Sequence, residues 1–195
     1  MTYRRSFVTA LLLIFLTTGN AQNWDVDLAK SINPNPPASG YWKFTSASVY
    51  VVSAAVPVGL LTAGFIKNDP VLKRRSYAII GAIAIELIIS EPLKRIINRE
   101  RPAEKYPTDF FPYTIVHGRS FPSGHTSLAF TMAAGLSIEY KKWYVVVPAY
   151  LWACSVGYSR IYLGMHYPTD ILGGAATGIG SAYLSHWLNK KIFRK

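Results

Sequence analysis

The sequence is poor in cysteine and in charged side chains. Its single thiol, Cys154, cannot form a disulfide within the chain, and its apolar surroundings predict a buried, inert thiol. Only 16% of the 195 residues are charged, whereas soluble domains carry about a quarter. Half of the residues are hydrophobic. This composition is typical of a membrane protein and disfavours an ordinary soluble domain.

Carboxylates are the scarcest of the charged groups. Ten acidic residues stand against 21 lysines and arginines, which gives a formal net charge of +11. The acidic residues around the polar motifs show no metal-ligand spacing, so we expect no metal and no cofactor. They are Glu86, Glu91, Glu100, Glu104 and Asp109. Glu86 lies inside an apolar segment, where acids are rare, and we expect it to make a polar contact between helices.

The N-terminus has the features of a targeting segment. Arg4 and Arg5 precede an apolar run over residues 7–16, and small residues follow it. This run is shorter than the ~20 residues that span a bilayer. We therefore interpret residues 1–21 as a secretory signal peptide, with an uncleaved anchor as the alternative.

Residues 22–45 are interpreted as an interfacial segment. Trp24, Leu28 and Ile32 recur at helical spacing among polar residues, which predicts a short helix at the membrane surface. Three prolines, beginning with Pro34, then end this helix.

Five long apolar segments predict an all-α fold, a polytopic transmembrane helical bundle. Each is close to the ~20 residues of a spanning helix, and their small residues allow helices to pack closely in lipid. Strands are disfavoured because the runs are long and do not alternate. The segments are 46–66, 76–97, 121–140, 143–160 and 170–188.

The basic residues indicate how these segments are oriented. Clusters of basic residues follow the first, third and fifth segments. If the chain crosses the membrane five times, all of these clusters lie on the same side. The positive-inside rule predicts that this side is cytoplasmic. Orientation thereby explains the net charge, and we exclude nucleic acid as a partner. The clusters are Lys67, Lys73, Arg74 and Arg75; Lys141 and Lys142; and Lys190, Lys191, Arg194 and Lys195.

Three polar motifs fall on the opposite, extracytoplasmic side of the predicted bundle. In the first, Lys94 is followed seven residues later by Arg101. Arginine presents a planar fork that matches phosphate oxygens, and lysine supplies a compact positive charge. Four other outer cations are interpreted as contacts to lipid headgroups. These are Arg95, Arg99, Lys105 and Arg119.

The second motif is Pro122-Ser123-Gly124-His125, at the start of the third segment. Ser123 is a favourable N-cap, and Gly124 lets an anion approach the free N–H groups of the helix N-terminus. His125 then faces the same site, as a proton donor to a leaving oxygen and later as a base towards water. The alternative is an ordinary helix start with an interfacial histidine.

The third motif joins Arg160, His166 and Asp170. His166 and Asp170 are four residues apart, so the carboxylate can hold one ring N–H and leave the other nitrogen as a nucleophile. Arg160 adds a third positive charge. The alternative assigns Asp170 to helix capping and His166 to a headgroup contact. Together, the three motifs predict a site that holds a phosphate and attacks it with an imidazole, without a metal.

The order and spacing of the motifs resemble those of the type-2 phosphatidic-acid phosphatase (lipid phosphate phosphatase) superfamily, in its bacterial membrane branch. That family shows Lys, six residues, Arg-Pro; then Pro-Ser-Gly-His; then Ser-Arg, five residues, His, three residues, Asp, and this chain matches every position. The resemblance implies a phosphohistidine on His166, oriented by Asp170, with His125 as general acid and then base. It also implies a phosphate clamp formed by Lys94, Arg101, Ser123, Gly124 and Arg160.

The same resemblance makes residues 46–195 a membrane phosphatase domain whose active site faces the periplasm or exterior of a bacterial inner membrane. It implies a phosphorylated lipid as substrate, with membrane lipids around it. Candidates are a polyprenyl diphosphate, lipid A phosphate, phosphatidylglycerophosphate and phosphatidic acid. The loop 98–121, with Phe110, Phe111, Pro112 and Tyr113, is expected to line the access for a head group or chain.

A second hypothesis belongs to a different functional class. The protein would be a non-catalytic membrane transporter or lipid-phosphate binding protein that uses its cations only for recognition. His125 and the spacing of His166 to Asp170 argue against it, because binding alone needs neither.

Overall fold

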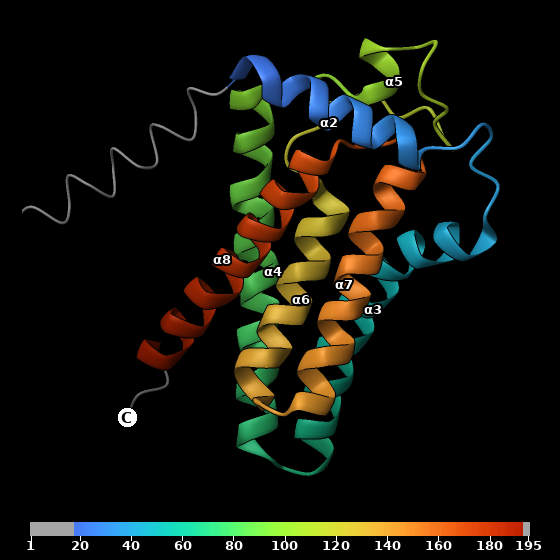
Figure 1. Cartoon of the computed structure of the whole chain (residues 1–195). Coiled ribbons are helices and arrows are strands. Elements are labelled where there is room, and N and C mark those ends of the chain that lie inside the picture. Colours follow the sequence, from blue (N-terminus) through green and yellow to red (C-terminus); the bar gives the residue numbers. More distant parts are fainter. Residues whose placement is uncertain (1–17, 193–195) are drawn as a thin grey trace, which may run out of the picture.

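The structure of the protein is a computed structural model that describes residues 18–192, with side chains from residue 24 onwards. Over that range the fold is all-helical, and α2 lies across one end of a bundle of five long helices (Figure 1). The helices are α2 Thr18–Ile32, α3 Gly40–Ile66, α4 Pro70–Ile97, the short α5 Pro102–Lys105, α6 Gly124–Tyr140, α7 Trp143–Tyr162 and α8 Pro168–Ile192. Most of the predicted signal peptide lies outside the described residues.

The five predicted apolar segments are confirmed as helices, and α2 corresponds to the predicted short helix. Both α3 and α4 begin six residues earlier than the hydrophobic pattern indicates. At α4 the reason is local: Asp69 accepts hydrogen bonds from the backbone N–H groups of Val71 and Leu72, and Pro70 occupies the first helical position. A strong cap thus starts the helix within a polar stretch. Asn98, in the left-handed conformation with φ of 53°, ends it.

Helix α6 lies at the centre of the bundle and contacts α3, α4, α7 and α8. Its contact with α8 is the closest, because glycines let the two backbones approach. A Cβ atom at Gly174 would lie 2.7 Å from the carbonyl oxygen of Ser123, and one at Gly178 would collide with the carbonyl of Ser127. The first turns of α6 and α8, which carry His125 and Asp170, are therefore held side by side.

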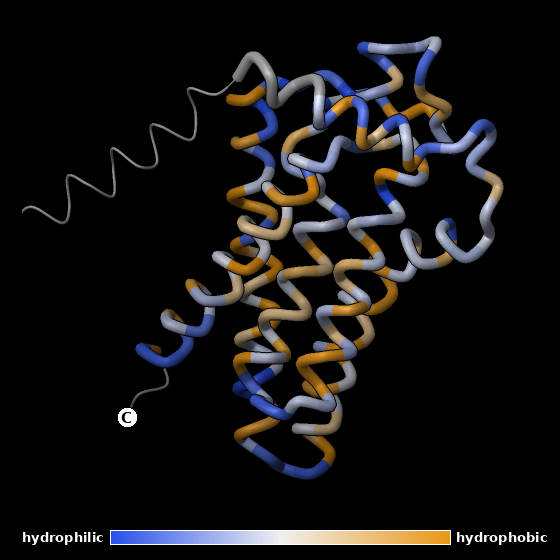
Figure 2. Tube along the Cα trace, viewed as in Figure 1, coloured by the Kyte–Doolittle hydropathy of each residue, from blue (hydrophilic) through white to orange (hydrophobic). Residues whose placement is uncertain are grey.

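Two helices of the described chain, α3 and α4, are long and apolar enough to cross a membrane by length and composition. Figure 2 shows hydrophobic residues along the middle of the bundle and hydrophilic ones at the lower turn. Large apolar side chains also face outwards, which indicates an apolar environment. Examples are Phe44, Val51, Ile88, Leu151 and Leu172. Spanning by α6, α7 and α8 stays a prediction.

The prediction for Cys154 is wrong, because its thiol is exposed on the outer face of α7. The inner face of this helix is formed by Ala153 and Val156, both fully buried. The position after Ala153 turns away from that face, so an apolar neighbourhood in sequence did not mean burial in the protein.

Candidate active site

A cavity of about 360 Å³ lies at the end of the bundle where α4 and α7 end and α6 begins. Its wall contains six of the eight residues that the motifs single out. They are Lys94, Arg101, Gly124, His125, Arg160 and His166. The other two, Ser123 and Asp170, are fully buried behind that wall. The three motifs, which lie far apart in the sequence, thus form one site.

His166 lies in the turn between α7 and α8 and is 3% exposed. Its Nδ1 atom is 3.5 Å from Asp170 Oδ2, and its Nε2 atom is 3.3 Å from Arg101 Nη1. An ionised carboxylate only accepts hydrogen bonds, so the proton of the neutral ring is on Nδ1, which faces Asp170. The Nε2 atom, which lies next to Arg101, therefore has a free lone pair. The lone pair of Nε2 is thus placed beside a cation that would hold a phosphate.

The electrostatic surroundings keep the His166 ring neutral. Burial lowers the pKa of His166 to about 4, and the positive charges of Arg160 and Arg101 act in the same direction. Asp170 opposes this shift with its hydrogen bond and its negative charge. At neutral pH the imidazole is therefore uncharged, and its Nε2 lone pair is available to a nucleophilic reaction.

Asp170 is held by three donors besides His166. Its Oδ2 atom accepts from the Ser120 hydroxyl at 2.5 Å and from the backbone N–H of Tyr167 at 2.8 Å. Its Oδ1 atom accepts from Arg99 Nη1 at 2.8 Å. The Ser120 hydroxyl also lies 3.4 Å from His166 Nδ1, so it bridges the carboxylate and the ring. Sequence reasoning missed Ser120, although it lies two residues before the second motif.

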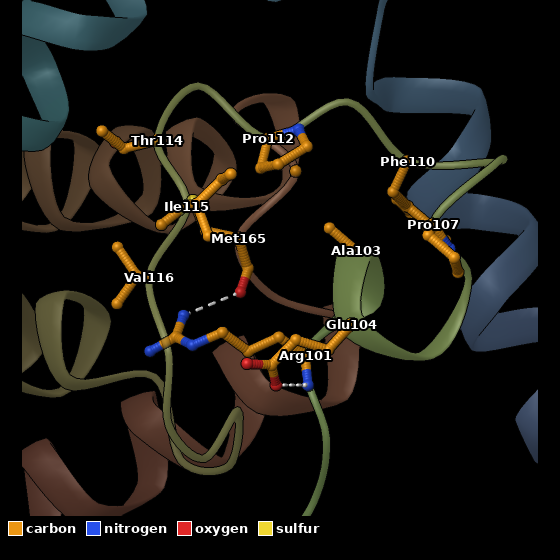
Figure 3. Close-up of a pocket in the computed structure, with 11 residues that line it drawn as sticks. Arg101, Ala103, Glu104, Pro107, Phe110, Pro112, Thr114, Ile115, Val116 and Met165 are labelled. Carbon is orange, nitrogen blue, oxygen red and sulfur yellow. Dashed lines mark hydrogen bonds between the residues drawn. The ribbon is translucent and has the colours of Figure 1, made fainter.

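Two of the three predicted phosphate-binding cations carry a buried donor that is not used: Arg160 is buried, and Arg101 is half-buried. Arg160 Nη1 donates to the Ser46 hydroxyl at 2.6 Å, and Arg101 Nη1 donates to the Met165 carbonyl at 3.0 Å, a bond that Figure 3 shows. The Nε atom of each is buried without a hydrogen-bond partner among the described residues. Buried guanidinium donors are normally satisfied, so both side chains are suited to bind an anion.

Lys94 reaches the start of α6 from the last turn of α4. Its Nζ atom pairs with Glu91 Oε1 at 2.9 Å and lies 3.6 Å from the position that a Cβ of Gly124 would take. Gly124 therefore leaves room between the ammonium group and the N-terminus of α6, where free N–H groups favour an anion.

The two other residues of the second motif differ in exposure to the cavity. His125 lines it and packs edge-to-face against the ring of Tyr50, with 4.9 Å between ring centres. Ser123 is the N-cap residue of α6, as predicted, but its side chain makes no capping hydrogen bond, and its hydroxyl accepts from Thr126 Oγ1 at 3.0 Å. The Ser123 backbone N–H instead donates to the carbonyl of Asp170 and so joins the motifs.

The headgroup assignment is wrong for Arg99, whose guanidinium pairs with Asp170 and with Asp25 of α2. Arg99 also lines a second outer cavity of about 320 Å³ together with Lys105 and Arg119.

Glu86 is buried and lines the main cavity, and its Oε1 atom has no hydrogen-bond partner within the described chain. In residues 18–192, no group of three or more His, Cys, Asp and Glu side chains is placed to hold a metal ion.

Comparison with known proteins found a matching family and several similar proteins. A model of the PAP2 superfamily matches residues 76–194. A lipid A 4'-phosphatase from Bacteroides thetaiotaomicron is 33% identical over 106 residues, which are 51% of this chain and 47% of that relative. The chain thus spans about half the length of this curated relative.

Two solved structures have a similar fold. LpxE from Aquifex aeolicus is 34% identical, with a TM-score of 0.69, over 84% of this chain and 95% of that one. A transmembrane PAP2-type phosphatidylglycerolphosphate phosphatase from Bacillus subtilis is 25% identical, with a TM-score of 0.71, over 95% of this chain and 97% of that one.

Proposed function

Because this chain belongs to the PAP2 superfamily, we propose that it is a membrane-bound lipid phosphatase that works through a phosphohistidine, without a metal ion. One observation carries the proposal: the lone pair of a neutral His166 faces a cavity that Lys94, Arg101 and Arg160 also line. Three fixed positive charges stabilise the charge that develops on a transferring phosphoryl group.

The reaction has two steps. In the first, His166 Nε2 attacks phosphorus, the bond from phosphorus to the lipid oxygen breaks, and His125 gives that oxygen a proton. In the second, His125 takes a proton from water, the resulting hydroxide attacks phosphorus, and the bond to Nε2 breaks to release inorganic phosphate. Asp170 holds the Nδ1 proton throughout and stabilises the positive ring of the phosphohistidine.

The substrate that we propose to test first is a phosphate ester of lipid A, because one relative is a lipid A 4'-phosphatase. An apolar pocket of about 270 Å³ supports a lipid substrate, since it shares Arg101 and Val116 with the main cavity. Figure 3 shows Pro112, Ile115 and Met165 in its wall. Phe110 and Pro112, two of the residues expected to line the access for a head group or chain, are part of the wall of this apolar pocket. Tyr113 instead lies under the Lys43 ammonium group, which is 4.3 Å from its ring centre.

We also propose that the site faces the periplasm or exterior from a bacterial inner membrane. The predicted cytoplasmic clusters support this orientation, because the α3–α4 turn, the α6–α7 turn and the C-terminal end of α8 lie at the end of the bundle remote from α2 (Figure 1). The motifs lie at the end that α2 covers.

The test is phosphate release by the purified protein in detergent, with EDTA present. Short-chain lipid A phosphate is the first substrate, followed by phosphatidic acid, phosphatidylglycerophosphate and a polyprenyl diphosphate. We expect release by the wild type and its loss in both His166→Ala and Arg160→Ala. Release that EDTA abolishes, or that survives His166→Ala, contradicts the mechanism. Binding of all four lipids without any release supports the binding or transport hypothesis instead.

A further inference from the structure

Arg99 joins two buried carboxylates that belong to different helices. Its Nη1 atom donates to Asp170 Oδ1 at 2.8 Å, and its Nη2 atom donates to Asp25 Oδ2 at 2.5 Å. The two carboxylate side chains are 0% and 2% exposed. The guanidinium carbon lies 3.9 Å from the centre of the Tyr167 ring, a cation–π contact that fixes the plane of the fork.

Asp25 also holds the residue that precedes Asp170. Its Oδ1 atom accepts from the backbone N–H of Thr169 at 2.9 Å, and its Oδ2 atom accepts from the Thr169 hydroxyl at 2.6 Å. Thr169 lies in the first turn of α8, where backbone N–H groups lack partners within the helix. Asp25 therefore supports Asp170 by two routes, through Arg99 and through the start of α8.

Helix α2, which carries Asp25, is also attached to the outer loop and to α7. The side-chain amide of Asn33 donates to the carbonyls of Phe111 and Tyr162 and accepts from the backbone N–H of Phe111. Lys30 forms an ion pair with Asp109 at 2.6 Å. The family match begins only at residue 76, so α2 lies outside the part of the chain that the match covers.

We propose that Asp25 and Arg99 are positioning residues for the His166–Asp170 pair, which makes α2 a working part of the active site. This inference rests on the proposed roles of His166 and Asp170. Arg99 occupies one oxygen of Asp170 and leaves the other to face Ser120 and the His166 ring. Asp25 balances the charge of Arg99 and keeps its fork between the two carboxylates. Without Asp25, the fork of Arg99 loses one of its two carboxylate partners and holds Oδ1 of Asp170 less firmly.

The test is steady-state kinetics of Asp25→Asn in the full-length protein, with the lipid phosphate that the wild type hydrolyses. The substitution keeps the shape of the side chain and removes its charge. We expect kcat to fall about tenfold, the loss that corresponds to one charge-assisted hydrogen bond. We expect KM and the inhibition constant of inorganic phosphate to stay unchanged, because Lys94, Arg101 and Arg160 are not touched. Arg99→Lys, which keeps the charge but not the fork, should lower kcat in the same way.

A double-mutant cycle separates positioning from general support of the fold. If Asp25 acts through Asp170, then Asp25→Asn has no further effect on the residual kcat of Asp170→Asn. The matched control is Lys30→Gln, which removes another attachment of the same helix and should leave kcat unchanged. Thr169→Val, which at nearly constant volume deletes a hydroxyl that donates to Asp25 and accepts from Arg99, provides a second variant if Asp25→Asn does not fold.

Three results overturn the inference: an unchanged kcat in Asp25→Asn, the same loss in the Asp170→Asn background, or an equal loss in Lys30→Gln. Failure of the proposed function looks different. In that case His166→Ala keeps its phosphatase activity, whatever Asp25→Asn does. Loss of activity in His166→Ala together with full activity in Asp25→Asn contradicts the positioning role alone.

Discussion

Among the described residues, two histidine–carboxylate pairs lie at opposite ends of the bundle, and a third joins the exposed His117 to Glu104. In the pair at the cavity, His166 Nδ1 lies 3.5 Å from Asp170, and the two side chains are 3% and 0% exposed. In the other pair, His186 of α8 lies 2.8 Å from Glu139 of α6, and the histidine is 39% exposed. The shorter contact belongs to the pair that lies away from the cavity.

Under the proposed mechanism, a hydrogen bond to a carboxylate is therefore not sufficient to make a histidine a nucleophile. Burial and the neighbouring arginines keep His166 neutral, and the same arginines line the space where a phosphate would bind. His186 faces outwards from the bundle. The cations around the ring, rather than the carboxylate beside it, distinguish the two ends.

Removing each histidine in turn should give the largest contrast. We expect His166→Ala to lose about 10³-fold or more of the turnover rate, because the nucleophile itself is deleted. His186→Ala should keep the wild-type rate. The measurement is inorganic phosphate release at saturating lipid phosphate. Equal losses in the two variants would contradict a nucleophilic role that is specific to His166.

The arginines of the two ends provide the next comparison. Arg101→Ala should lower kcat by about 10²–10³-fold, as the loss of a fixed donor to a developing charge does. Arg75, which lies 4.5 Å from the centre of the Tyr140 ring at the other end, should tolerate alanine with little change in rate. The readout is kcat/KM with melting temperature as a control. A comparable rate loss in Arg75→Ala would contradict a role that is specific to the cavity.

Acid should inactivate the enzyme through His166. The neutral ring is present above its pKa of about 4 and is lost as the pH falls through that value. Turnover at saturating substrate should therefore drop about tenfold for each pH unit below this range, since the neutral fraction shrinks in that proportion. His186→Ala should leave the pH dependence of turnover unchanged. An acidic limb near the ordinary histidine value of about 6.5 would show that burial does not keep the ring neutral.

The smallest expected effect concerns the hydroxyl between Asp170 and His166. Ser120→Ala should lower kcat about tenfold or less, because one hydrogen bond to the carboxylate is lost while Arg99 and the Tyr167 N–H remain. Ser155, whose hydroxyl bonds only the Leu151 carbonyl on the exposed side of α7, is the matched control. A wild-type rate in Ser120→Ala would remove Ser120 from the positioning network.

Most residues of the site could be predicted because their spacing within short motifs carries chemical meaning. His166 and Asp170 are four positions apart, and Lys94 and Arg101 flank a single turn. The supporting contacts have no such local pattern, since Asp25 and Thr169 are 144 positions apart. Arg99 was assigned to lipid because an outer arginine next to a helix end suits a headgroup equally well, and only the fold brings two carboxylates to it.

The helices could be predicted for a similar reason, since long apolar runs have few alternatives. Their boundaries required local detail that hydropathy does not contain. The cap at Asp69 starts α4 ahead of three consecutive basic residues, and a left-handed Asn98 ends it. That end places Arg99 and Arg101 in the loop beside the cavity, so a backbone detail sets the position of two functional cations.

The backbone contact between α6 and α8 has a mechanical consequence. Gly174 and Gly178 hold the outer half of α8 against the carbonyls of Ser123 and Ser127. The C-terminal half of α8 is bonded to α4 and to α6 as well. Helix α8 is therefore braced along its length, and we expect the geometry at its first turn to change little when the surrounding lipid changes.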